Sequence, residues 1–213
     1  MKDIPVFTTD FGVASLILKE IPYRGEAYIR IQDLQPGMIG PMIDECVSFC
    51  VMAGAQTVYA TGSAELEEYP LDITMIRMTG PAGQDGEIAM LWPVLPENVA
   101  QWREIYNRRM KQVPHAATMI SRDEQRICDA MGTYFVHDNG RVLGIGWLEV
   151  DELLAVASEV PGEGERVTRT LLSTASSDRV SLEVASTNTR AISLYNRMGF
   201  IAVEEISRWY RVR

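Results

Sequence analysis

Two glycines and a run of backbone amides at residues 160–168 could bind an anion. The loop V-P-G-E-G-E-R-V leads into T-R-T-L-L, which predicts a helix that begins in the loop. A loop that turns into a helix points free backbone N–H groups outward, and the helix dipole favours an anion there. Gly162 and Gly164 would let the backbone approach a diphosphate closely. The N–H groups would come from Glu165, Arg166, Val167 and Thr168.

This loop has two interpretations. If a phosphate binds, the carboxylates of Glu163 and Glu165 must face away, because they would otherwise repel it. The alternative is a plain glycine turn that starts a helix and binds nothing.

A second stretch with a suggestive spacing is N-T-R-A-I-S-L-Y at 188–195. Asn188 is predicted to cap a helix N-terminus, since Asn is strongly preferred there. Tyr195 lies seven residues on, two turns later, and therefore on nearly the same helix face. The alternative for Tyr195 is a buried core side chain.

The segment 179–200, R-V-S-L-E-V-A-S-T-N-T-R-A-I-S-L-Y-N-R-M-G-F, closely resembles the last core strand–helix unit of the GNAT superfamily of acyl-CoA-dependent N-acyltransferases. The matching residues are Asn188, Ala191, Leu194, Tyr195, Gly199 and Phe200. The loop P-G-E-G-E-R-V at 161–167 resembles the family's Gly-rich pyrophosphate loop. The resemblance covers residues 87–213 well and the first 80 only weakly. It implies an α/β (α+β) fold with a mixed, mostly antiparallel central sheet flanked by helices.

The resemblance also implies roles for individual residues. Tyr195 would protonate the departing CoA thiolate, and a phenol with a pKa of about 10 is a sensible acid for that step. Asn188, with Ala191 on the same helix, would contact the pantetheine or phosphate arm. The predicted strand at 153–160 resembles the family strand that splays from its neighbour, so the backbones of Ala155, Val156 and Ala157 would hydrogen-bond the pantetheine and the acyl carbonyl.

The loop departs from the family pattern at Arg166. Counting back from Leu171 and Leu172 puts the family's second loop glycine at Arg166, whereas counting from Gly162 and Gly164 offsets the helix by two residues. Arg166 could pair with a CoA phosphate, or it could block the site. We favour the contact.

An attacking amine must lose a proton, so a carboxylate is expected to accept it directly or through water. The candidates are Glu149, Glu159 and Glu183, each on a predicted strand near the acyl site, and we assign the role to Glu149. The resemblance does not fix this position, and each of the three has the alternative of a solvated or structural charge. Trp147 either lines the site that binds the acceptor amine or packs in the core, and we favour packing in the core.

The elements that must position these residues follow from apolar periodicity and turn signals. In the second part of the chain, strands are predicted near 88–93, 132–137, 142–150, 153–160, 179–184, 200–206 and 207–212. Helices are predicted near 96–112, 122–130 and 188–198, and residues 161–172 are predicted to be a loop that enters a further helix. Ser121 and Glu124 are interpreted as a capping box for the helix at 122–130. In the first part, strands are predicted at 13–19, 27–34, 56–60 and 71–79, with a turn at P-Y-R-G and a helix at 40–53.

The first part looks like a shortened copy of the second. Pro36 and Pro161 lie 125 residues apart, and each follows two strands and precedes a helix and a short strand. We therefore expect a degenerate, cofactor-free GNAT-like half-domain at 1–80, a linker at 81–86 and an acetyltransferase domain at 87–213. The alternative is coincidence, because this order of elements is common.

The composition of the chain bears on which classes of partner and which cellular location are expected. The chain has 213 residues with 20 Lys+Arg and 29 Asp+Glu, a net charge of -9, which argues against a general nucleic-acid binder. No apolar run approaches the roughly 20 residues of a membrane span, and the N-terminus lacks the core of a signal peptide, so a cytoplasmic protein is expected. Cys46 and Cys50 are predicted core thiols, and two histidines with these cysteines make no zinc pattern.

Two functions of different kind remain in view. The leading prediction is an N-acetyltransferase that uses acetyl-CoA as co-substrate, without a metal, to acetylate a primary amine of a small molecule or peptide. The alternative is a catalytically inactive acyl-CoA-binding or regulatory module. A homodimer that serves only as an interaction surface is a third hypothesis.

Overall fold

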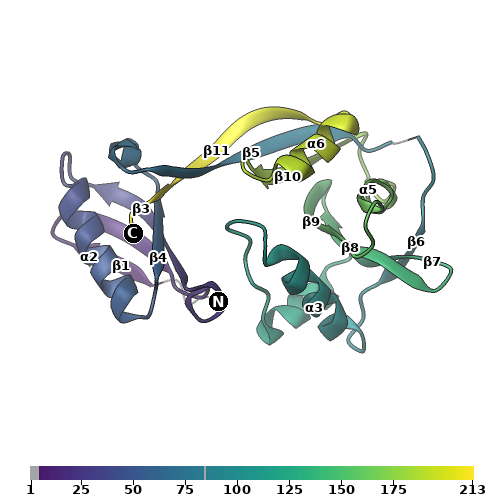
Figure 1. Cartoon of the computed structure of the whole chain (residues 1–213), viewed down its shortest axis with the longest axis horizontal. Helices are drawn as coiled ribbons and strands as arrows, with labels where there is room; N and C mark the ends of the chain where they lie inside the picture. The colour runs from purple at the N-terminus through teal and green to yellow at the C-terminus, as the bar shows by residue number, and fades with distance from the viewer. Residues whose placement is uncertain (1–4, 84) are drawn as a thin grey trace. The chain divides into compact units, whose positions relative to one another are not determined.

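A computed structural model describes residues 5–83 and 85–213, and it divides the chain into two compact units (Figure 1). The first unit comprises the residues up to Met75 together with Glu205–Arg213, and the second is Ile76–Glu204. Strands β5 (Leu71–Pro81) and β11 (Ile201–Arg211) each contribute residues to both units. The units differ from the predicted division at the C-terminal end, where the last nine residues lie with the first unit.

The first unit consists of a sheet and one long helix. Its elements are β1 (Val6–Thr9), β2 (Gly12–Ile17), α1 (Ile21–Arg24), β3 (Glu26–Leu34), α2 (Ile39–Met52), β4 (Thr57–Thr61) and η1 (Ala64–Glu68). The strand order is β1-β2-β3-β4-β11. All neighbours are antiparallel except β3 and β4, which are parallel and joined through α2. The helix packs on one face of this sheet.

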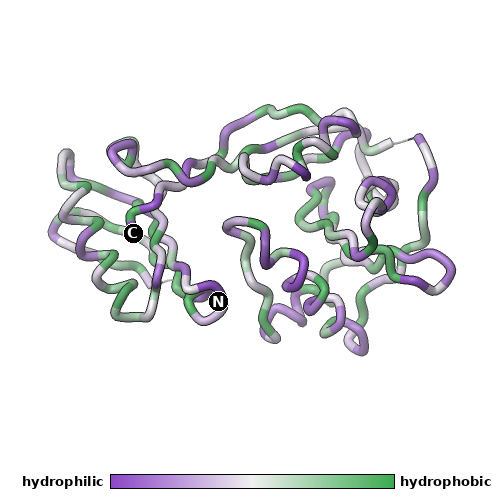
Figure 2. Tube along the Cα trace, in the orientation of Figure 1, coloured by the Kyte–Doolittle hydropathy of each residue, from purple (hydrophilic) through white to green (hydrophobic). Residues whose placement is uncertain are grey.

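Helix α2 buries one apolar side against the sheet. Hydrophilic and hydrophobic residues both occur along its length (Figure 2). Met42, Ile43, Cys46 and Cys50 pack on the strands, with Cys46 and Cys50 fully buried. Burial raises the pKa of the Cys46 thiol to about 12 and that of Cys50 to about 11. The predicted core thiols and the helix near 40–53 are therefore confirmed.

The second unit is a larger mixed sheet with helices on both faces. Its other elements are β6 (Met90–Pro93), α3 (Val99–Met110), η2 (Ser121–Asp123), α4 (Glu124–Asp129), β7 (Thr133–Asp138), β8 (Arg141–Glu149), β9 (Glu152–Ser158), α5 (Gly164–Leu172), β10 (Arg179–Ala185) and α6 (Thr189–Arg197). The strand order is β11-β5-β10-β9-β8-β7-β6. Strands β6 to β9 are successively antiparallel, and β9 and β10 are parallel. The predicted fold class is confirmed.

Each face of this sheet carries its own apolar core. On one face, α5 and α6 pack on the strands through Val167, Leu171 and Tyr195. On the other face, α3 and α4 supply Trp102 and Ile127. Helix α5 lies very close to β8, because a Cβ at Gly144 would come within 3.0 Å of the Val167 side chain and one at Gly146 within 2.0 Å of Leu171. The two glycines therefore set how closely α5 approaches the sheet.

Several local predictions are wrong, each for an identifiable reason. The capping box at Ser121 does not form, because Asp123 Oδ2 accepts from the Ile120 N–H at 2.8 Å while Glu124 pairs with Arg103. The P-Y-R-G turn is the short helix α1, with Gly25 in the left-handed conformation after it. The two strands predicted at 200–212 are one strand, β11, since no glycine, proline or asparagine interrupts it. Strand β1 was not predicted.

Candidate active site

The parallel strands β9 and β10 are paired over two residue pairs, near the start of each strand. Glu152 and Leu153 lie opposite Ser181 and Leu182, and the pairing ends there. Beyond Leu153, β9 continues to Ser158 with β8 as its only paired strand in the described chain. The backbone of β9 on its β10 side is therefore left without a strand partner over residues 154–158.

A bulge in β9 marks the start of this opening. Trp147 lies opposite Ala155 and Leu148 opposite Leu153, so Leu154 is the extra residue. Bulges bend a strand and leave a residue unpaired, and the Leu154 side chain is 47% exposed. The bend therefore occurs at the residue where β9 leaves β10.

The predicted backbone contacts, Ala155, Val156 and Ala157, lie in the unpaired part of β9. Ala155 and Ala157 pack in the core under α3 and α4, whereas Val156 packs against the core under α5 and α6. Their side chains thus pack into the apolar cores on the two faces of the sheet, and their peptide groups lie in the plane of the sheet. Trp147 is buried against Trp102, with the Arg126 guanidinium 4.9 Å from its ring centre, so it packs.

Helix α5 begins beside the opening with no side-chain cap. It starts at Gly164, and Glu163 occupies the N-cap position without a side-chain hydrogen bond. The Val167 N–H already donates to the Glu163 carbonyl at 2.9 Å. Within the described chain, no hydrogen-bond acceptor faces the N–H groups of Gly164, Glu165 and Arg166. These three amides are available to an anion.

The prediction that four backbone N–H groups, at residues 165–168, are available to a phosphate is therefore only partly right. Glu165 and Arg166 have free amides, but Val167 and Thr168 lie inside the helix, where the Thr168 hydroxyl donates to the Gly164 carbonyl. Gly162 takes a left-handed φ of 91°, and nothing lies within 4 Å of the position where its Cβ would be. The loop follows the two glycines, so Arg166 is the third residue of the helix rather than a loop position.

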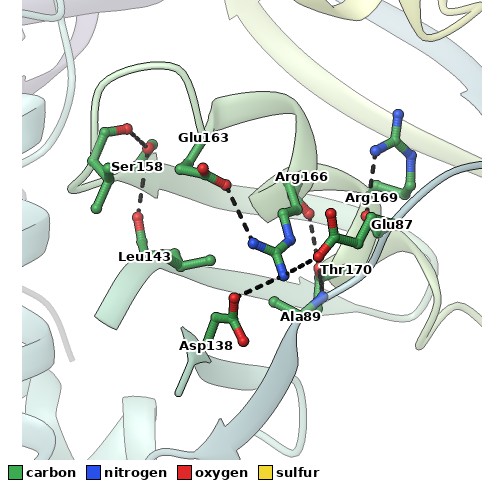
Figure 3. A network of polar contacts seen from close by, with 10 residues as sticks. Glu87, Ala89, Asp138, Leu143, Ser158, Glu163, Arg166, Arg169 and Thr170 are labelled. Carbon is green, nitrogen blue, oxygen red and sulfur yellow. Dashed lines mark hydrogen bonds and ion pairs between the residues drawn. The ribbon is translucent and has the colours of Figure 1, made fainter. Parts of the chain in front are cut away.

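The charged side chains of this first turn are all paired, and Figure 3 shows the ion pairs of Arg166. Arg166 forms ion pairs with Glu87 at 2.7 Å, Asp138 at 3.1 Å and Glu163 at 3.8 Å. Glu165 pairs with Arg169 at 2.8 Å and with Arg197 at 3.8 Å. Both glutamates that would oppose a phosphate are therefore neutralised by arginines, and the Arg166 guanidinium is held by three carboxylates.

Asn188 caps α6 as predicted. Its Oδ1 accepts from the Ala191 N–H at 3.2 Å, which satisfies one free amide of the helix. The proposed contacts of Asn188 and Ala191 to a pantetheine or phosphate arm stay predictions.

Tyr195 is buried, two turns further along α6. It is 8% exposed, and its ring centre lies 5.8 Å from that of Phe200. No group in the described chain hydrogen-bonds its hydroxyl, and burial raises its pKa to about 12. The phenol therefore stays protonated, and its O–H is free to donate.

The three candidate bases all have partners. Glu149 is exposed and accepts from the Trp147 indole N–H at 3.1 Å. Glu159 follows β9 and pairs with Arg108, with Arg109 at 3.9 Å. Glu183 pairs with Arg77 at 3.0 Å, and Arg77 also binds Glu204. Of the three, only Glu149 forms no ion pair with a cation within the described residues.

The first unit repeats the local geometry of the loop. Pro36 and Gly37 precede α2 as Pro161 and Gly162 precede α5, and both glycines have left-handed φ angles, 75° and 91°. Both helices begin three residues after the proline. The shared origin of the two parts stays a prediction.

Three features nevertheless distinguish the first unit from the second. Strands β3 and β4 are paired over five residues, Glu26–Arg30 with Thr57–Thr61, so they do not open. Pro41 occupies the place of Arg166 and has no N–H. The Glu65 carboxylate accepts from the Gly37 N–H at 3.1 Å. The first unit thus lacks both the open strand and the full set of amides.

Within residues 5–83 and 85–213, no group of three or more His, Cys, Asp or Glu side chains is arranged to hold a metal ion. No helix in the same residues is long and apolar enough to cross a membrane.

Comparison with known proteins gives the fold. No protein-family model matches the sequence, and no curated protein matches it either. Among solved structures, the chain resembles a GCN5-related N-acetyltransferase from Sphaerobacter thermophilus, with a TM-score of 0.57, 13% identity and coverage of 94% of this chain and 76% of that one. A GCN5-related N-acetyltransferase from Anabaena variabilis gives a TM-score of 0.59 at 11% identity, covering 93% and 58%. The chain has the fold of the GNAT superfamily.

Proposed function

We propose that the protein is an N-acetyltransferase that transfers an acetyl group from acetyl-CoA to a primary amine of a small molecule or peptide. The observation that carries this proposal is the β9–β10 pair, hydrogen-bonded over two residue pairs and then open, beside the free amides of α5. The fold shared with N-acetyltransferases supports it.

The proposed binding mode uses backbone groups. The diphosphate of CoA would accept from the N–H groups of Gly164, Glu165 and Arg166, where the helix dipole also favours negative charge. The pantetheine would extend along the unpaired edge of β9 and hydrogen-bond peptide groups of Ala155, Val156 and Ala157. Acetyl-CoA is a substrate in this scheme, and no metal is required.

In the proposed reaction, the amine nitrogen attacks the thioester carbonyl, so a C–N bond forms and the C–S bond breaks. Tyr195 would donate its O–H to the departing thiolate, and its raised pKa keeps that proton in place beforehand. The proton released by the amine would pass to a carboxylate. Glu149 is the proposed acceptor, because Glu159 and Glu183 each form an ion pair with an arginine.

A matched pair of glycine variants tests the site. Gly162 and Gly140 both have left-handed φ angles, 91° and 79°, and neither has a neighbour within 4 Å of its Cβ position. Gly162→Ala and Gly140→Ala therefore impose similar backbone strain, but only the first lies at the proposed diphosphate site. We expect Gly162→Ala to weaken acetyl-CoA binding at least tenfold by titration calorimetry, and Gly140→Ala to leave it unchanged. Absence of binding to the unmodified protein would overturn the proposal.

An inactive acyl-CoA-binding or regulatory module is the second candidate. One observation favours it: all three candidate bases have a hydrogen-bond or ion-pair partner. Release of free CoA thiol from acetyl-CoA, measured over a panel of primary amines, separates the two. Turnover that falls in Glu149→Gln supports the enzyme, whereas binding without turnover for any amine supports the module.

A further inference from the structure

The turn between β8 and β9 has an unfavourable backbone. Val150 and Asp151 both have left-handed φ angles, 49° and 60°. Two-residue hairpin turns need such angles, and Asn or Gly normally supplies them. A β-branched residue there is a genuine outlier, and the Val150 side chain gains nothing from packing because it is 93% exposed. Such strain persists only where neighbouring contacts fix the conformation.

Asp151 makes those contacts. Its Oδ1 accepts from the N–H groups of Ser176 and Ser177 at 2.7 and 3.2 Å, and its Oδ2 accepts from the Ser177 hydroxyl. Its backbone carbonyl accepts from the Ser181 N–H at 3.0 Å. These bonds tie the β8–β9 turn to the loop between α5 and β10. The bond from the Ser177 hydroxyl is the main cause that lowers the pKa of Asp151, so the carboxylate stays charged at neutral pH.

The position of these bonds gives them a consequence for the site. Glu152 and Leu153, which follow Asp151 directly, are the residues of β9 that pair with β10. The contact between the two strands is therefore short, and Asp151 lies at its closed end. Beyond it, the Leu154 bulge starts the opening.

We propose that Asp151 is a positioning residue: it anchors the closed end of the β9–β10 pair and thereby sets where the two strands diverge. Its effect on acyl-CoA rests on the proposed function, because the backbone of Ala155–Ala157 is what the divergence exposes. Asp151 itself does not touch the substrate.

Glycine substitutions provide the test. Asp151→Gly removes the carboxylate and relaxes the left-handed backbone, so any loss comes from the missing bonds and not from added strain. Asn139→Gly is the matched control, because Asn139 has a left-handed φ of 47° in the β7–β8 turn. Asp151→Asn is the rescue variant, because its amide oxygen still accepts from the backbone N–H groups of Ser176 and Ser177.

Two measurements are made on each variant: acetyl-CoA affinity by titration calorimetry, and amide hydrogen exchange of β9 and β10. We expect Asp151→Gly to raise the Kd at least tenfold and to speed exchange at Ser181 at least tenfold. Asp151→Asn should stay within threefold of the unmodified protein on both, and Asn139→Gly should change neither. The melting temperature of each variant is the control for a general loss of stability. In a positioning role, Asp151→Gly melts close to Asn139→Gly although its affinity is lost, and Asp151→Asn restores the affinity.

The outcomes separate this proposal from the proposed function. If the unmodified protein binds acetyl-CoA and Asp151→Gly binds equally well, the positioning role is overturned and the function stands. If the unmodified protein does not bind, the function falls, and the exchange rate at Ser181 alone decides the anchor. If Asp151→Gly does not fold, Ser177→Ala replaces it, since it removes only the hydroxyl bond. A threefold rise in Kd or exchange rate then supports the anchor, and no change in either overturns it.

Discussion

Arg166 donates from Nη2 to Asp138 Oδ2 across 3.1 Å and so ties the first turn of α5 to the last residue of β7. The same nitrogen lies 2.7 Å from Glu87, in the segment before β6 (Figure 3). The side chain expected to face a CoA phosphate is thus held between protein carboxylates. Its backbone N–H remains available at the helix N-terminus. Arg166 can therefore bind an anion through its amide while its guanidinium holds the helix in place.

The first prediction separates these two parts of Arg166. Arg166→Ala keeps the amide and removes the ion pairs, so we expect the melting temperature to fall by a few degrees while the acetyl-CoA Kd changes less than threefold. Differential scanning fluorimetry and calorimetry measure the two. Arg208→Ala is the control: its partners Glu67 and Glu205 are 64% and 47% exposed, and exposed pairs contribute little. A tenfold weaker affinity with an unchanged melting temperature would assign the guanidinium to the cofactor.

Local signals in the sequence were enough for some of these features. The type and position of Asn188 are enough to predict the helix cap that the structure shows. For α5, the sequence left two possible positions of the helix start, and the structure has the one counted from Gly162 and Gly164.

Features that depend on distant residues were not predictable in the same way. Arg166 meets Asp138 across 28 residues, and Arg77 meets Glu183 across 106. The residues around an arginine in the sequence do not indicate which distant carboxylate will form an ion pair with it. The placement of Glu205–Arg213 with the first unit depends likewise on β11 pairing with β4. The Leu154 bulge leaves no mark in the apolar pattern of β9, so the exact point of divergence was not visible.

The second prediction concerns the close approach of α5 to β8. A Cβ at Gly144 would lie 2.4 Å from the Ala157 carbonyl oxygen and 3.0 Å from the Val167 side chain. The backbone atom cannot move aside cheaply, so Gly144→Ala should lower the free energy of unfolding by about 1–3 kcal/mol, as overpacking typically does. Urea denaturation measures it. Gly83→Ala is the control, since nothing lies within 4 Å of that Cβ position. Equal stability of the two variants would show that α5 is not packed this closely.

The third prediction concerns Tyr195. Tyr195→Phe removes a hydroxyl that has no hydrogen-bond partner in the described chain, so stability below pH 10 should be unchanged. If the phenol donates to the thiolate, kcat should fall about 100-fold or more, with the acetyl-CoA Kd within twofold. Steady-state kinetics and calorimetry measure these quantities. An unchanged kcat would remove Tyr195 from the reaction.

The raised pKa of Tyr195 gives a further signature at alkaline pH. The folded protein holds the phenol proton to about pH 12, whereas an unfolded tyrosine loses it near pH 10. The corresponding stability is fully present below pH 10 and is lost as the pH rises from there through about 12. The unmodified protein should therefore lose stability relative to Tyr195→Phe above pH 10. Parallel stability curves for the two proteins over that range would contradict the burial of the phenol.

The fourth prediction is that each chain binds one acyl-CoA. The first unit repeats the loop and helix of the second, but its strands β3 and β4 stay paired over five residues and Pro41 lacks the third amide. Titration with acetyl-CoA should therefore give a stoichiometry of one. Glu65→Ala is an informative variant, because it frees the Gly37 N–H without opening β3 from β4. Its stoichiometry should also stay at one, since an anion site without an open strand cannot hold the pantetheine. A value of two in either protein would mean that the first unit binds the cofactor as well.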